Sequence, residues 1–205
     1  MRFGRRVLTA ALLGAALTAC APSSDDEGFS VPVVGPAKVD VDTPALRSAK
    51  AAAGIVACTP GTGSNDLPAV TLPCLGGGPE VRLDRLEGPL VVAVWAQWCG
   101  PCREELPYYQ RLSQEYAGKL TVVGIDYSDV RPDWAMQLLS DTGATFAQLA
   151  DPSGDIAGRR PFPRMNQMPV IALVDAHGDV EVQIKAITSY TQLDRLVQEY
   201  AGVSA

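Results

Sequence analysis

An apolar segment followed at once by two closely spaced cysteines constrains the fold of this chain more than any other feature. Residues 89–96 are apolar and rich in β-branched side chains, which predicts a buried strand. Residues 103–117 carry good helix formers at helical spacing, so a helix should begin near Cys99 and contain Cys102. Unpaired amides and the macrodipole at such a helix N-terminus favour a thiolate over a thiol. Cys102 lies one helical turn away, close enough to attack a mixed disulfide formed at Cys99, and the segment therefore predicts a redox-active dithiol.

Two other uses of a Cys-x-x-Cys pair are weaker explanations. A zinc site needs a second pair of ligands, but the chain has a single histidine, His177, and its other cysteines are scattered. We therefore expect no metal. A purely structural disulfide would not need the aromatic residue Trp98 beside it or the start of a helix after it.

The first twenty residues predict export and membrane anchoring. A basic start, Met1 to Arg6, precedes an apolar run that is too short for a comfortable transmembrane helix, as in a secretory signal. The run ends Leu-Thr-Ala before Cys20 and resembles the bacterial lipoprotein signal, in which the cysteine is lipidated; an ordinary signal peptide with a chance cysteine is the alternative. We expect a signal peptide over residues 1–19, lipidated Cys20 with a flexible tether over 20–54, and one domain over 55–205. The alanine-rich residues 45–56 could form a short helix.

The charge of the chain limits its partners. It has 17 basic and 23 acidic side chains, a net charge of −6. Loss of Arg2, Arg5 and Arg6 with the signal would leave 14 basic against 23 acidic side chains, about −9. An acidic body argues against nucleic acid and against electrostatic adhesion to anionic lipid. Membrane association must then come from the lipid anchor.

Cysteine usage agrees with export. Apart from Cys20, four cysteines remain, and the local geometry of Cys99 and Cys102 selects those two as one pair. Cys58 and Cys74 are left to form the other, closing a loop worth roughly 3 kcal/mol in the chain-entropy model. We expect this second disulfide to be structural. A second redox pair is the alternative.

The rest of the chain predicts alternating strands and helices. Residues 69–72 and 80–83 should form a β-hairpin around a glycine-rich loop. Further elements are predicted by apolar runs, helix stop signals and amphipathic spacing. They are strands at 119–127, 146–150, 170–175 and 179–185, helices at 133–142 and 191–200, and a weak helix around 155–159.

The residues around the dithiol resemble a known family. Trp95-Ala-Gln-Trp-Cys-Gly-Pro-Cys102, with Pro107 five residues later, is similar to the active-site segment of the thioredoxin superfamily. Cys102-Arg-Glu-Glu-Leu-Pro107 is most similar to the TlpA/ResA-like branch of membrane-anchored thiol-disulfide oxidoreductases. The resemblance runs from about Leu67 to Tyr200. It implies an α/β, thioredoxin-like fold with a central mixed β-sheet flanked by helices and an N-terminal β-hairpin extension. It also implies that Cys99 is the nucleophile and Cys102 the resolving thiol.

The same resemblance implies roles for other residues. Met168-Pro169 matches the family's cis-proline beside the disulfide, which with Trp98 would contact substrate, although Val170 stands where the family often has a polar residue. Glu105 matches a glutamate thought to assist proton movement at the thiols, and burial would raise its pKa. A carboxylate that complements the helix dipole is the alternative role. Ala93 replaces the buried aspartate of thioredoxin.

The resemblance implies a protein-disulfide oxidoreductase without cofactor, held by its lipid anchor at the extracytoplasmic face of the cell membrane. Its Gly-Pro dipeptide leans toward a reductant, which implies a membrane electron carrier of the CcdA type and a client such as apocytochrome c. We expect a monomer that acts on protein disulfides or dithiols. The alternatives are a disulfide-forming oxidase, a thiol peroxidase and a non-catalytic binding module of the same fold.

Overall fold

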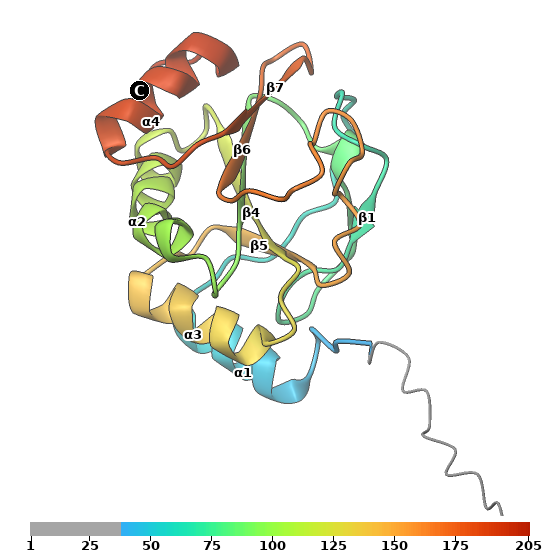
Figure 1. Cartoon of the computed structure of the whole chain (residues 1–205). Helices are drawn as coiled ribbons and strands as arrows, with labels where there is room; N and C mark the ends of the chain where they lie inside the picture. Colours follow the sequence, from blue (N-terminus) through green and yellow to red (C-terminus); the bar gives the residue numbers. More distant parts are fainter. Residues whose placement is uncertain (1–37) are drawn as a thin grey trace, which may run out of the picture. The chain divides into compact units, whose positions relative to one another are not determined.

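A five-stranded mixed sheet forms the centre of the domain in the computed structural model, which describes residues 38–205 (Figure 1). Its strand order is β5-β4-β3-β6-β7, with β3, β4 and β5 parallel and β6 and β7 antiparallel to their neighbours. The bounds are β3 Leu90–Trp95, β4 Thr121–Tyr127, β5 Ala147–Asp151, β6 Val170–Val174 and β7 Val180–Ile184. The predicted thioredoxin-like α/β fold is confirmed.

The helices contribute side chains to one core, on the face of the sheet where β3 presents Val91, Ala93 and Trp95. Their ends follow the expected local chemistry: the Thr43 hydroxyl accepts the Leu46 amide at the start of α1. Gly143 ends α3 in the left-handed conformation. The helices are α1 Pro44–Ala53, α2 Gly100–Glu115, α3 Pro132–Thr142 and α4 Tyr190–Leu196, which continues as a π-helical turn, η2, Val197–Ala201.

Hairpin and loop segments supply the second core, with Leu90, Val92 and Val94 of β3. The predicted hairpin is present as β1 Thr71–Leu72 and β2 Val81–Arg82, followed by the short 3-10 helix η1 Leu83–Arg85.

The loop from β5 to β6 also packs in this second core, and the weak helix predicted around 155–159 is wrong. Turns occupy this stretch. The Asp151 carboxylate accepts the amides of Asp155 and Ile156 at 2.7 and 3.1 Å. Those two amides are therefore satisfied by a side chain, and the turns are stable without a helix.

The folded unit begins earlier than predicted. It runs from Lys38 to Ala205, and α1 packs with its buried residue Leu46 in the first core. The prediction of a flexible tether is therefore wrong for residues 38–54, whereas the short helix expected in the alanine-rich residues 45–56 is present as α1. The predicted signal peptide, Cys20 and the start of the tether lie outside the described residues. Within residues 38–205, no helix has the length and apolar character needed to span a membrane.

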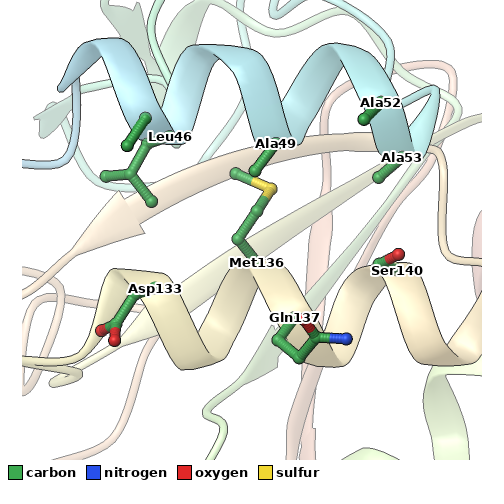
Figure 2. Close-up of a pocket in the computed structure, with 9 residues that line it drawn as sticks. Leu46, Ala49, Ala52, Ala53, Asp133, Met136, Gln137 and Ser140 are labelled. Carbon is green, nitrogen blue, oxygen red and sulfur yellow. The ribbon is translucent and has the colours of Figure 1, made fainter.

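A groove of about 370 Å³ lies between α1 and α3 (Figure 2). Met136 projects from α3 toward Leu46 and Ala49 of α1. The side chains that line the groove are mostly small and apolar, and none of the predicted site residues is among them. This groove is therefore separate from the dithiol.

Candidate active site

The two cysteines of the predicted dithiol lie at the start of α2 and form a disulfide. Cys99 is the N-cap residue, in extended conformation, and its Sγ accepts the Cys102 amide at 3.3 Å. Pro101 occupies the first turn, where its missing N–H costs nothing. An amide that points at Sγ stabilises negative charge on that atom when the disulfide is reduced. Both cysteines are buried, whereas Gly100 and Pro101 between them are exposed.

Trp98 precedes the dithiol directly, and the Met168–Pro169 peptide precedes the neighbouring strand β6. Trp98 is half-exposed, and its indole Nε1 donates to the carbonyl oxygen of Ser128 at 3.3 Å. The Met168–Pro169 peptide is cis, as expected. Val170 pairs with Val94 across the sheet, so Pro169 lies beside the end of β3 from which the dithiol follows. The fold thus brings together segments 70 residues apart in the sequence.

Glu105 is a buried carboxyl one turn beyond Cys102, only 2% exposed. Its Oε1 accepts the Ile187 amide at 2.7 Å, and its Oε2 accepts the Tyr109 hydroxyl at 3.5 Å. Loss of hydration raises the pKa of Glu105 from 4.5 to about 7, and the two hydrogen bonds oppose this rise. Near neutral pH the group can therefore both hold and release a proton.

An acidic pair beside the active-site loop was missed from the sequence. Asp129 accepts the Gln97 amide at 3.3 Å and the Arg131 amide at 2.8 Å, which ties the active-site loop to the loop after β4. Asp126 is the penultimate residue of β4 and lies opposite Trp95 in register. Both carboxyls are buried. The sequence signal for this pair was Asp126, an acid in a mostly apolar predicted strand. The end of this strand lies at the same edge of the sheet as the dithiol.

Protonation of Asp126 follows from this setting. The pKa of Asp126 lies well above its ordinary range, mainly because the carboxyl is desolvated. The charge and hydrogen bond of Asp129 raise it further. Among the described residues its Oδ1 has no hydrogen-bond partner. Both observations favour the neutral carboxyl, because an unpaired buried oxygen costs less on an uncharged group than on a carboxylate.

The structure also contains the second expected disulfide, between Cys58 and Cys74. Both sulfurs are in the second core, with the hairpin. An additional group beside this disulfide was missed from the sequence: the Nζ of Lys50 donates to Cys74 Sγ at 2.9 Å.

The family model described as AhpC/TSA matches residues 64–183. The matched segment covers more than half of the chain and includes the dithiol, Glu105 and Pro169. The chain belongs to the AhpC/TSA family.

Two of the similar proteins within reach of sequence comparison are thiol-disulfide proteins. The thiol-disulfide oxidoreductase ResA of Oceanobacillus iheyensis is 26% identical over 125 residues, which cover 59% of this chain and 62% of ResA. The thiol:disulfide interchange protein HelX of Rhodobacter capsulatus is 36% identical over 90 residues, covering 42% of this chain and 49% of HelX. The chain thus spans less than two thirds of the length of these relatives. The expected resemblance to ResA-like thiol-disulfide oxidoreductases is confirmed.

Two solved structures of thiol-disulfide proteins are also similar to this chain. The structure of MTB dsbF is 27% identical with a TM-score of 0.58, covering 67% of this chain and 98% of that one. A secreted thiol-disulfide isomerase from Corynebacterium glutamicum is 26% identical with a TM-score of 0.54, covering 66% of this chain and 82% of that one. Both similarities extend over most of the folded unit.

Proposed function

We propose that the protein is a thiol-disulfide oxidoreductase that acts on protein substrates through Cys99 and Cys102. The observation that carries the proposal is the capping geometry, in which Cys99 Sγ accepts the Cys102 amide at the start of α2. This arrangement favours the thiolate that exchange chemistry requires.

The proposed reaction balances without a cofactor. The Cys99 thiolate attacks a substrate disulfide, a mixed disulfide forms, and one substrate thiolate leaves and takes a proton. Cys102 then loses its proton to Glu105, whose pKa of about 7 suits this transfer. The Cys102 thiolate attacks Cys99 Sγ, which releases the second substrate thiol and leaves the Cys99–Cys102 disulfide. Two electrons pass from protein to substrate.

The cellular setting is part of the same proposal. Residues 1–20 support export and lipidation at Cys20, and so a position at the extracytoplasmic face of the membrane. There a reductant needs re-reduction, which a membrane carrier of the CcdA type would supply. The name of the Corynebacterium relative, a secreted thiol-disulfide isomerase, supports export. Apocytochrome c is the proposed client, and a monomer the proposed state.

Trapping tests the proposal directly. Cys102→Ser should accumulate mixed disulfides through Cys99, resolved by non-reducing electrophoresis and mass spectrometry, whereas Cys99→Ser in the same cells should accumulate none. Equal adducts in both variants, or none in either, would refute the proposed chemistry. Glu105→Gln should slow resolution of a peptide mixed disulfide, while Glu104→Gln on the exposed side of the helix should not.

The direction of electron flow has its own measurement. A reductase predicts a reduction potential near that of thioredoxin, about −270 mV, and a value near −120 mV would identify a disulfide-forming oxidase instead. A turnover assay with hydrogen peroxide excludes or establishes the thiol peroxidase.

A further inference from the structure

Lys50 is a buried cation whose amine contacts a disulfide sulfur. It lies on α1 with 8% of its surface exposed, and its Nζ donates to Cys74 Sγ at 2.9 Å and to the carbonyl oxygen of Gly77 at 2.8 Å. Burial of an ammonium is costly unless it is paired, and a disulfide sulfur is a weak acceptor. The environment of Lys50 is therefore incomplete while the disulfide is intact.

Among the described residues, no carboxylate fully compensates this charge. In residues 38–205 none of the ion pairs includes Lys50. Asp42, the acid whose charge acts on Lys50, is paired with Arg47 through two hydrogen bonds of 2.6 and 3.0 Å. Burial lowers the pKa of Lys50, and Asp42 only partly opposes this effect. The partner that would neutralise Lys50 is a Cys74 thiolate, which exists only when the disulfide is reduced.

Both cysteines of this disulfide are buried, but the segments around them differ. Cys58 is 4% exposed, and it lies in an irregular segment whose neighbours Val56, Ala57 and Thr59 are exposed. Cys74 is 1% exposed and faces Lys50. An attacking thiolate therefore reaches Cys58, and Cys74 is the leaving group.

We propose that Cys58–Cys74 is a second redox couple, in which Lys50 stabilises Cys74 as the leaving thiolate. A dithiol reductant attacks Cys58 Sγ through its thiolate; the Cys58–Cys74 bond breaks, and Cys74 leaves as a thiolate paired with the Lys50 ammonium. The second thiol of the reductant attacks the mixed disulfide and releases Cys58, which takes one proton. The reductant becomes a disulfide, its other proton goes to solvent, and two electrons reach the protein.

The test isolates this couple in the full chain with Cys20, Cys99 and Cys102 replaced by serine, which leaves two of the five cysteines. The protein is equilibrated with mixtures of reduced and oxidised dithiothreitol, quenched with acid, unfolded and alkylated to count free thiols. Lys50→Met should lower the equilibrium constant for reduction about tenfold, which corresponds to about 30 mV for two electrons. Lys50→Arg should retain the original value, and Lys119→Met on the surface should change nothing.

If Lys50 has only a structural role, its replacement should change the equilibrium constant for reduction in the opposite direction. If Lys50 only supports the Gly77 turn, Lys50→Met loosens the fold around the disulfide and makes its reduction easier. A raised or unchanged equilibrium constant therefore overturns the proposal. Should Lys50→Met fail to fold, Lys50→Gln keeps a donor for the Gly77 carbonyl without the charge and carries the same two predictions. The proposed couple does not involve Cys99, so its failure would leave the proposed oxidoreductase untouched.

Discussion

Replacement of Glu105 by glutamine should stabilise the protein, and more so as the pH rises. The variant keeps an amide oxygen that can accept the Ile187 N–H, and its amide NH2 can donate to the Tyr109 hydroxyl oxygen, but it cannot ionise. The difference from the original protein therefore reports the cost of a charge on a carboxyl that is 2% exposed.

The size and sign of the effect follow from the pKa. In the unfolded chain a glutamate ionises near 4.5, whereas in the fold the pKa of Glu105 is about 7. Between these values the unfolded state releases its proton first, so the free energy of unfolding falls as the pH rises. At about 1.4 kcal/mol per pKa unit the full loss is about 3 kcal/mol. Relaxation of the fold and entry of water once the buried carboxyl is charged reduce this loss to about 2 kcal/mol.

Urea unfolding of the oxidised protein at several pH values between 4 and 8 measures this difference. Glu105→Gln and the original protein should have similar free energies of unfolding at pH 4, where the glutamate is protonated in both states. The variant should gain about 2 kcal/mol by pH 8, with most of the gain between pH 4.5 and 7.

Glu104→Gln is the matched control, because Glu104 is the exposed neighbour on the same helix. Its difference from the original protein should stay within about 0.5 kcal/mol at every pH. A Glu105→Gln difference that does not change with pH, or that follows the control, would refute the interpretation of Glu105 as a buried carboxyl that titrates near neutrality.

Three further predictions use the same unfolding assay. Gly124→Ala should cost about 3 kcal/mol, because its Cβ would lie 1.9 Å from Gln148 Oε1, which accepts the buried Trp95 indole N–H; a cost below 1 kcal/mol would contradict this packing. Asp129→Ala should cost about 2 kcal/mol and speed hydrogen exchange at the Gln97 amide, because two backbone N–H donors lose their acceptor. Asp133→Ala, at an exposed position, should cost less than about 1 kcal/mol. Equal effects of the two substitutions would argue against a role of Asp129 in holding the active-site loop. Joint replacement of Cys58 and Cys74 by serine should cost about 3 kcal/mol, and no loss would show that the disulfide does not constrain the unfolded chain.

The acidic pair gives a physical context for the alanine at position 93. Ala93 lies opposite Gly124 on β4, and Asp126 follows two residues later, so side-chain alternation places all three on one face of the sheet. This face carries the core to which the dithiol belongs. A buried acid is thus present near the active-site loop, contributed by the neighbouring strand.

Local patterns in the sequence determined the dithiol and its setting. The β-branched run predicts β3, the helix formers predict α2, and the two cysteines between them follow from the spacing alone. The hairpin, α3 with its proline and glycine ends, and the strand pair at β6 and β7 were predicted for the same reason, because each depends on neighbours within a few residues.

Only the tertiary structure decided which distant groups meet. Lys50 contacts Cys74 across 24 residues, Glu105 accepts an amide 82 residues away, and Asp129 holds the active-site loop from the loop after β4. Packing also ordered residues 38–54 and replaced an expected helix after β5 by turns around Asp151. Burial, and with it the pKa of each carboxyl and amine, is set by the whole fold, since desolvation depends on every segment that covers the group.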